Sequence, residues 1–477
     1  MQTLRKFVSV LTLSMALVTV AAVPPPPPVA LDGHWEGAIT IMGSELAIRV
    51  DFRTGAPGLA ATIDIPQQGA STLPLKSVSY QPPRVHFELP AGPGLATFEG
   101  VAAGETIDGI FSQGAASGTF RLTRQAVGVV APTPTPAPPY REEEVSFTTP
   151  AGTFAGTLTA PHGAGRHPAV VLITGSGPQN RDEELFGFKP FRLIADHLTR
   201  RGVVVLRCDD RGVGGTTAKR EGSTTADYAG DALAAVAFLK GRAEVDARRI
   251  GLLGHSEGGL VAPIAAAQSG DVAFIVLVSA SGVTGERLML AQAEAIGRAG
   301  GAPEADLKAE AALQKRLFGA ARSGAGWDEV RAEAKALALA KLTALPAEQR
   351  QAIGDLGAYA DRVIAGQITM AQTPWFRYFL DHDPAADLAQ VRCPVLALFG
   401  EKDLQVPAEA NREAIAAALA RGGNHGVTTK VLPGANHLYQ RAVTGSPDEY
   451  PTLPKEFVAG FLDTISGWIE ARQGAGS

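Results

Sequence analysis

The sequence predicts an α/β protein: a mostly parallel sheet with helices on both faces, preceded by a small antiparallel β-barrel-like domain. Two proline-rich segments, 23–30 and 127–140, divide the 477 residues. Such segments are stiff and typical of boundaries between domains. Short alternating runs lie between them, which is typical of antiparallel strands. Continuous apolar runs that alternate with helical patterns follow the second segment, which is typical of a buried parallel sheet.

The composition is that of a globular chain with a substantial core. Hydrophobic residues make up 45% and charged residues 19% of the sequence, and the formal net charge is −5. A mildly acidic chain has no electrostatic footprint for nucleic acid and no basic patch for a membrane surface. We therefore expect a small molecule as the partner and no nucleic acid. Composition gives no indication of the oligomeric state.

The first 22 residues have the pattern of a secretory signal peptide. Arg5 and Lys6 precede an apolar stretch of 14 residues, Phe7–Val20, which is shorter than the ~20 residues that span a bilayer. Small residues end the stretch, and we expect cleavage after Ala22. An uncleaved membrane tether is the alternative. The predicted location is periplasmic or secreted, without stable membrane insertion after cleavage.

Export permits disulfides, but the chain has only Cys208 and Cys393. One lies at the C-terminal end of a predicted parallel strand and the other just before the N-terminal end of another. Opposite ends of non-adjacent strands are too far apart to bridge. Both residues are predicted to be free thiols.

Residues 31–126 are predicted to form an antiparallel, barrel-like meander of about eight strands. Glycine and proline turns separate six alternating runs: Ala38–Ile41, Leu46–Phe52, Ala60–Ile65, Ser77–Tyr80, Val85–Leu89 and Thr119–Leu122. The domain carries no catalytic constellation. A structural role is favoured over binding of an apolar ligand or the substrate.

Residues 141–477 are predicted to form the parallel sheet. The expected strands are Glu142–Phe147, Thr153–Thr159, Ala169–Ile173, Val203–Arg207, Ile250–Leu253, Ala273–Val278, Val395–Phe399 and Thr428–Leu432. The expected helices are Phe191–Arg201, Tyr228–Lys240, one from Gly258 onward, and Glu456–Arg472. The first two strands form a hairpin, and the others alternate with helices.

Residues 283–390 interrupt this alternation. They are rich in alanine and charged residues and fall between two core strands, so they are predicted to form a helical cap above the C-terminal edge of the sheet. The cap ends in an aromatic run that contains Trp375, Phe376 and Phe379. These three side chains are candidates for substrate contact, and packing of cap against core is the equal alternative.

The run Gly254-His-Ser-Glu-Gly258 lies between a predicted strand and a predicted helix. In that context G-x-S-x-G is a nucleophile elbow, a sharp turn that projects the serine hydroxyl above the sheet. Small residues are needed two before and two after the serine, because strand and helix pass close together. Ser256 is therefore the candidate nucleophile.

A serine hydroxyl needs a base, and that base needs an orienting acid. His437 follows the strand Thr428–Leu432 directly, at the sheet edge where open α/β sheets keep their sites; His382 is a distant alternative. Asp403 follows the strand Val395–Phe399, with Glu401 as the alternative acid. The order Ser256, Asp403, His437 is that of one fold class.

From about Glu142 onward the chain resembles the α/β-hydrolase superfamily, in particular exported bacterial serine hydrolases of the esterase and serine-aminopeptidase-like group. The resemblance rests on the runs Gly175-Ser-Gly-Pro-Gln-Asn-Arg-Asp-Glu183, Asp209-Asp-Arg-Gly-Val-Gly214, Gly254-His-Ser-Glu-Gly-Gly259 and Gly400-Glu-Lys-Asp-Leu-Gln-Val-Pro407. It covers about 70% of the chain and leaves out the N-terminal β domain. It implies an α/β-hydrolase fold with a Ser256 nucleophile, a His437 base and an Asp403 acid.

The resemblance also implies an oxyanion hole of two backbone N–H groups. One is expected from Glu257, the residue after the nucleophile. The other is expected from Ser176 or Gly177, in the loop after Ala169–Ile173. This chain lacks the HGGG run of many lipases and esterases, which leaves the choice of donor open. The run Asp209–Gly212 is expected to brace the site with ion pairs and turns rather than to take part in the chemistry.

The predicted activity is hydrolysis of carboxylic esters with small to medium acyl groups, without metal or cofactor. The first alternative is an aminopeptidase-like enzyme, for which an acidic anchor is needed; the candidates are Asp182, Glu183, Glu184 and Glu257. A solvated loop is the favoured interpretation of these acids. The second alternative is a binding protein on an inactive hydrolase scaffold.

Overall fold

The computed structural model describes residues 30–41, 44–55, 58–65, 70–90, 95–113, 116–125, 138–347, 350, 353 and 355–472. The predicted signal peptide, all but residue 30 of the predicted spacer, and residues 127–137 of the predicted linker lie outside the described residues. Within the described part of the chain, no helix combines the length and apolarity needed to cross a bilayer.

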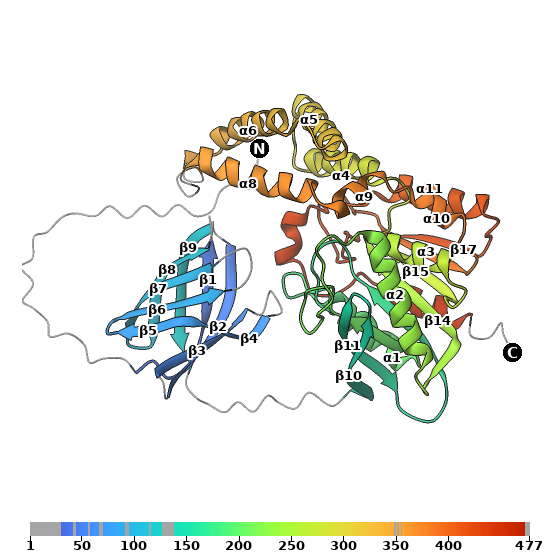
Figure 1. The fold of residues 1–477 in the computed structure, drawn as a ribbon, viewed down its shortest axis with the longest axis horizontal. Coiled ribbons are helices and arrows are strands. Elements are labelled where there is room, and N and C mark those ends of the chain that lie inside the picture. Colours follow the sequence, from blue (N-terminus) through green and yellow to red (C-terminus); the bar gives the residue numbers. More distant parts are fainter. Residues whose placement is uncertain are drawn as a thin grey trace, which may run out of the picture.

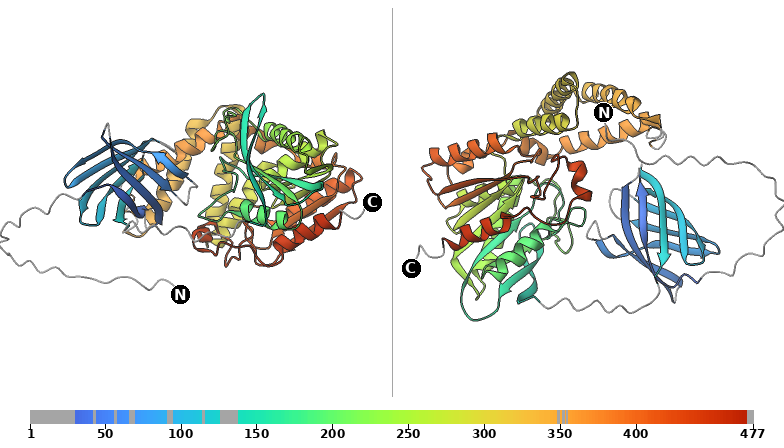
Figure 2. Two further views of the ribbon diagram at one scale, coloured as in Figure 1. Left: turned by 90° about the horizontal axis from the view of Figure 1, so that it is seen from below. Right: turned by 180° about the vertical axis from the view of Figure 1, so that it is seen from behind.

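The N-terminal part is an antiparallel, nearly closed sheet with nine described strands, which Figure 2 shows curled on itself. The strand order is β4-β3-β2-β1-β9-β8-β7-β6-β5. The strands are β1 (Gly33–Ile41), β2 (Ser44–Gly55), β3 (Gly58–Ile65), β4 (Ala70–Pro74), β5 (Lys76–Gln81), β6 (Arg84–Pro90), β7 (Leu95–Ala103), β8 (Thr106–Gln113) and β9 (Ala116–Arg124). The prediction of an antiparallel, barrel-like domain is confirmed.

Strands β4, β7 and β8 have no counterpart among the six predicted runs, and two facing glycines explain the absence of β7 and β8. Gly100 of β7 pairs with Gly109 of β8, so neither strand shows a full apolar alternation. A Cβ atom on Gly109 would lie 2.5 Å from the Phe120 ring, and one on Gly100 would lie 2.9 Å from it. The buried Phe120 ring thus fills the space that side chains on these strands would otherwise occupy.

The second sheet has eight described strands in the order β10-β11-β13-β12-β14-β15-β16-β17. They are β10 (Tyr140–Thr149), β11 (Gly152–Pro161), β12 (His167–Ile173), β13 (Val204–Cys208), β14 (Val245–His255), β15 (Phe274–Val278), β16 (Val395–Gly400) and β17 (Val427–Leu432). β10 and β11 form the predicted hairpin, and β11 joins β13 antiparallel. The other strands run parallel, so their C-terminal ends share one edge of the sheet.

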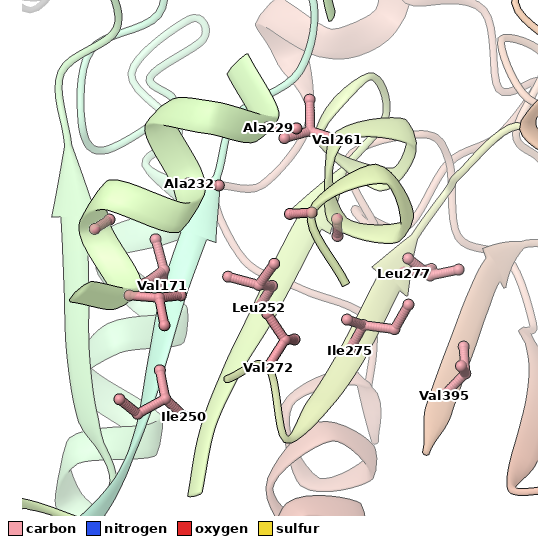
Figure 3. Packing of buried hydrophobic residues seen from close by; sticks show 14 of the residues in the cluster. Val171, Ala229, Ala232, Ile250, Leu252, Val261, Val272, Ile275, Leu277 and Val395 are labelled. Carbon is pink, nitrogen blue, oxygen red and sulfur yellow. The ribbon is translucent and has the colours of Figure 1, made fainter. Parts of the chain in front are cut away.

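Helices cover both faces of this sheet, as predicted (Figure 1). One face packs against α2 (Thr225–Lys240), α3 (Gly258–Gln268) and α11 (Ala408–Arg421), and the other against α1 (Pro190–Arg200) and α12 (Phe461–Glu470). Figure 3 shows the first face, where Val171, Leu252 and Ile275 of the sheet meet helix residues that include Ala229 and Val261. Burial of these aliphatic side chains, ~25 cal/mol per Å² of apolar surface, holds the layers together.

Two helix predictions need correction. The last helix begins at Phe461 rather than at Glu456, because Gly460 at its N-terminus has a φ of +82°, outside the helical region. Helix α11 was not predicted. Seven of its fourteen residues are alanine, so it shows little amphipathic contrast, although Ile415 and Leu419 are fully buried.

The cap comprises the helices that the structure describes between β15 and β16. They are α4 (Gly285–Ala299), α5 (Glu304–Ser323), α6 (Trp327–Ala344), α8 (Leu356–Ala371), α9 (Pro374–Asp381) and α10 (Pro384–Leu388). In Figure 1 most of them lie together, yellow to orange, along one side of the sheet. This agrees with the predicted helical insertion at 283–390.

Candidate active site

Ser256 lies in a sharp turn between β14 and α3. Its φ is +52°, a left-handed value that is costly for a residue with a Cβ atom. A Cβ atom on Gly254 would lie 1.9 Å from the carbonyl oxygen of Gly258, and one on Gly258 would lie 2.2 Å from that of Ile173. Only glycine fits at either position. This is the geometry of a nucleophile elbow, and it aims the Ser256 hydroxyl away from the sheet.

Asp403 and His437 come from the loops after β16 and β17 and form a buried pair. His437 Nδ1 lies 2.9 Å from Asp403 Oδ2. The other oxygen, Asp403 Oδ1, accepts the backbone N–H groups of Gln405 and Val406, each at 2.9 Å. Because Nδ1 donates to a carboxylate, Nε2 of a neutral His437 is left as the proton acceptor.

The pKa of Asp403 is lowered. Burial alone would raise it, but the His437 charge, the hydrogen bond from His437 and the backbone N–H of Val406 outweigh burial. Asp403 therefore stays ionised at neutral pH, as an acid that orients a histidine must.

Ser256 and His437 line one cavity of about 280 Å³. Between these two described residues there is no direct hydrogen bond in this structure. Catalytic hydrogen bonds are often long in a free enzyme and tighten when substrate binds. The three candidate triad residues are thus brought to one edge of the sheet, two of them in contact and the third in the same cavity.

The alternative acid and base lie elsewhere. Glu401 Oε2 accepts the backbone N–H of Gly434 at 2.7 Å and so ties two loops together. His382 Nε2 lies 3.1 Å from the Asp387 carboxylate at the end of the cap. Neither residue lines the cavity that contains Ser256.

The two candidates for the second oxyanion donor, both in the loop after β12, line different cavities. Ser176 lines the cavity with Ser256, whereas Gly177 lines a neighbouring cavity of about 90 Å³. The backbone N–H of Gly175 is already taken, since it donates to Glu183 Oε1 at 2.7 Å. Glu257 borders both cavities. The placement favours the N–H groups of Glu257 and Ser176.

A buried pair of Glu183 and His255 links three loops of the site. His255 Nδ1 lies 2.9 Å from Glu183 Oε1, and His255 Nε2 lies 3.0 Å from the backbone oxygen of His437. A carbonyl oxygen only accepts, so Nε2 carries a proton. Burial lowers the pKa of His255, but the negative charge of Glu183 outweighs it and the net shift is upward.

Sequence reasoning missed this pair. Glu183 was predicted only as a candidate anchor for a substrate amine or as part of a solvated loop. The sequence contains one signal for such a pair. His255 directly precedes Ser256, so it is buried beside the nucleophile and needs a polar partner. Its partner is 72 residues away in the chain and could not be identified from spacing.

The acids proposed to hold a substrate amine are all engaged within the protein. Asp182 pairs with Arg207, and Glu184 lies 3.2 Å from Lys189. Glu183 is buried against His255. These three acids are part of the fold rather than a solvated loop, which corrects the favoured interpretation.

The fourth acid, Glu257, joins the cap to the core. Its Oε1 accepts the Thr225 hydroxyl and Trp375 Nε1, each at 2.7 Å. Trp375 also stacks on Phe379, with ring centroids 5.4 Å apart. Both residues, with Phe376, line the cavity that contains Ser256. The aromatic run therefore packs cap on core and faces the cavity as well.

The run after β13 braces the oxyanion loop. Asp209 binds the Arg181 side chain, with Asp209 Oδ2 to Arg181 Nη2 at 2.7 Å. Asp210 accepts the Thr174 hydroxyl at 2.7 Å and the backbone N–H of Gln179 at 2.9 Å. Burial raises the pKa of Asp210 to about 7. These contacts agree with the bracing role predicted for the run.

The described residues contain no group of three or more potential metal ligands. Cys208 and Cys393 are free, as predicted, and burial raises the pKa of the Cys208 thiol to about 12. A thiol with so high a pKa is a poor nucleophile.

Comparison with known proteins identifies the family. The model of a family described as "Alpha/beta hydrolase family" matches residues 162–450. Esterase EstD of Thermotoga maritima is 40% identical over 118 residues, which are 24% of this chain and 27% of EstD. The chain thus spans about a quarter of the length of this curated relative.

Solved structures that resemble this chain include an esterase and a protein named Est1E. An esterase of Pyrococcus furiosus is 16% identical, with a TM-score of 0.41 over 70% of this chain and 91% of its own. Est1E of Butyrivibrio proteoclasticus, solved with ferulic acid, is 17% identical, with a TM-score of 0.39 over 69% of this chain and 97% of its own. Because the family model matches more than half of the residues, the chain belongs to the alpha/beta hydrolase family.

Proposed function

We propose that this protein is a serine esterase that hydrolyses carboxylic esters of small to medium acyl groups through Ser256, His437 and Asp403. The observation that carries the proposal is that His437, held by a buried hydrogen bond to Asp403, lines the same cavity as Ser256. A cavity lined by apolar side chains with a few convergent polar groups is typical of an active site for a small substrate.

In the proposed reaction, Ser256 Oγ attacks the acyl carbonyl carbon while His437 Nε2 takes the hydroxyl proton. The N–H groups of Glu257 and Ser176 stabilise the oxyanion of the tetrahedral intermediate. His437 then returns the proton to the departing alkoxide, which leaves Ser256 acylated. A water molecule, deprotonated by His437, attacks the acyl-enzyme and releases the carboxylic acid and the free serine.

Apolar side chains support an acyl group as the bound part. Leu260 of α3, Leu288 and Met289 of α4 and Phe379 of α9 line the cavity beside Ser256. This apolar part of the wall favours contact with a hydrocarbon chain, while polar residues that include Glu183, His255 and Glu257 line the rest of the cavity. The peptidase alternative finds less support, since its candidate anchors are engaged in internal pairs.

The test is hydrolysis of p-nitrophenyl esters from acetate to decanoate, beside an alanyl-anilide, by wild type and by Ser256→Ala. Cleavage of esters by wild type alone is the expected result. Cleavage of the anilide alone would replace the esterase by a peptidase. If no substrate is turned over and a fluorophosphonate does not label Ser256, the enzyme proposal fails. The alternative of a binding protein on an inactive hydrolase scaffold would then replace it.

Export of the protein and its division at 126–127 and 140–141 are also proposals. They rest on the apolar stretch Phe7–Val20 and on the proline-rich segments. Fractionation of cells that express the full chain, with N-terminal sequencing of the mature protein, tests export. A mature protein that begins after residue 22 is expected; an intact N-terminus in the cytoplasm would contradict it.

A further inference from the structure

The cap contains a cavity of its own, of about 160 Å³, between its helices. Helices α5, α6 and α8 supply most of its wall, and α4 and α9 supply the side nearest the core. Ten of its twelve lining residues are apolar, among them Leu317, Val330 and Ile364. The sequence did not predict this cavity. None of the proposed triad residues or oxyanion-hole residues lines it.

The cap cavity adjoins the cavity that contains Ser256. Met289, Met370 and Phe376 line both, so their side chains form the partition between the two. Two parts of this partition are methionines, whose unbranched side chains change rotamer readily to fit a ligand. A group bound at Ser256 therefore meets a deformable wall with more apolar space behind it.

The cavity is partly open to solvent, and two of its lining residues, Gln367 and Met370, are exposed. Water inside it gains few hydrogen bonds from the apolar part of the wall, so displacement of that water by an apolar group is favoured. Two polar side chains, Gln314 and Gln367, reach the wall, and Gln314 Oε1 is buried without a hydrogen-bond partner among the described residues. Hydrocarbon is the chemistry that such a wall accepts best, and cavities of this kind bind small apolar molecules.

We propose that the cap cavity receives the distal end of a medium-chain aliphatic acyl group whose carbonyl carbon lies at Ser256. This inference rests on the proposed esterase function and names its substrate class as esters of acids such as octanoate and decanoate. Short acyl groups occupy the cavity beside Ser256 alone, whereas longer ones displace the methionine partition and enter the cap.

The experiment fills the cap cavity from its far side. Ala334 of α6 lines the cap cavity and does not line the cavity at Ser256. Ala334→Phe puts a large ring into that space, and Ala334→Leu fills less of it. The control is Ala336→Phe, the same change on the same helix at an exposed position. The measured quantity is the ratio of kcat/KM for p-nitrophenyl decanoate to that for the acetate.

Ala334→Phe is expected to lower this ratio roughly 10-fold to 100-fold, since even one methylene in an apolar pocket changes kcat/KM about 10-fold or more. Ala334→Leu is expected to lower it less, and Ala336→Phe to leave it unchanged. An unchanged ratio in a folded Ala334→Phe variant would overturn the inference while the esterase function stands. Overpacking can unfold a domain; if melting shows this for Ala334→Phe, an unchanged ratio in Ala334→Leu overturns the inference instead.

A binding measurement separates this inference from the function on which it rests. Ser256→Ala and the double variant Ser256→Ala with Ala334→Phe are titrated with decanoate by calorimetry. Weaker binding by the double variant is expected, and equal binding would contradict the cap site. If wild type hydrolyses no ester of any length, the proposed function fails, whatever the titration shows.

Discussion

The Glu183 carboxylate bridges His255, the residue before the nucleophile, and Gly175, which begins the oxyanion loop. Its Oε1 lies 2.9 Å from His255 Nδ1 and 2.7 Å from the Gly175 nitrogen. His255 in turn reaches the backbone of His437. One carboxylate thus sets the relative positions of the elbow, the oxyanion loop and the histidine loop. Glu183 does so with a φ of +50°, a strained value that these contacts must offset.

Glu183→Gln is expected to lower kcat while KM changes little. The amide keeps the size of the side chain but removes the charge that holds His255, so groups that act on the transition state lose their exact placement. Stability should fall by about 1–3 kcal/mol, the cost of an impaired buried polar contact. Steady-state kinetics on a butyrate ester and urea unfolding at pH 7 measure both effects.

The control for this prediction is Glu184→Gln, a change to the neighbouring acid that pairs with Lys189. This variant should keep the wild-type kcat. An equal loss of kcat in both variants would contradict the positioning role of Glu183.

Asp403→Asn is expected to reduce kcat by about 10³–10⁴-fold with the protein still folded. The amide can present N–H toward His437 Nδ1 and stabilise the wrong tautomer, which leaves no base for Ser256. Single-turnover hydrolysis of a p-nitrophenyl ester measures the loss, and circular dichroism confirms the fold. The alternative acid gives the matched control, since Glu401→Gln should retain at least a tenth of the wild-type rate. The assignment of the acid would be reversed if Glu401→Gln were the inactive variant.

Asp210→Asn is expected to stabilise the protein at alkaline pH relative to wild type. Burial raises the Asp210 pKa from 3.8 to about 7, so between these values the folded state binds more protons than the unfolded state. Wild-type stability therefore decreases as pH rises through this window, and the asparagine variant lacks that contribution. The gain over wild type should grow by about 2–4 kcal/mol from pH 4 to pH 8, because Asp210 keeps some contact with solvent. Urea unfolding of both proteins at each pH tests this; a constant difference would refute it.

Trp375→Phe is expected to raise KM several-fold while kcat stays within about a factor of two. The change removes the hydrogen bond to Glu257, worth about 1–3 kcal/mol when the acceptor is charged, and so loosens the cap over the cavity. The enzyme then binds the substrate and the transition state less tightly by a similar amount, which raises KM and leaves kcat nearly unchanged. Trp327→Phe is the matched control, because Trp327 lies in the cap but does not line the cavity at Ser256. A larger effect from Trp327→Phe would show that the cap responds to general loosening and not to the Glu257 contact.

Much of the fold could be predicted from local patterns. Apolar strands alternating with helices indicated the parallel sheet, and a break in that alternation indicated the cap. The candidates Ser256, Asp403 and His437 each follow an apolar strand directly, so the common direction of parallel strands is enough to bring them to one edge. Strands β7 and β8 were hard to predict because residues far apart share one space, with Phe120 over Gly100 and Gly109. The start of α12 was misplaced because of the backbone conformation of Gly460, whose φ is +82°.

The sheet, its order of elements and the edge that carries the candidate site were therefore determined by short-range periodicity, which depends only on residues a few positions apart. The tertiary structure alone decided which polar groups pair and where empty space remains. The contacts of Glu183 with His255 and of Glu257 with Trp375 join residues 72 and 118 positions apart. The cap cavity is a space between five helices, α4, α5, α6, α8 and α9. No local sequence pattern predicts these polar contacts or this cavity. They depend on the directions of loops and on the shapes of side chains that meet only after folding.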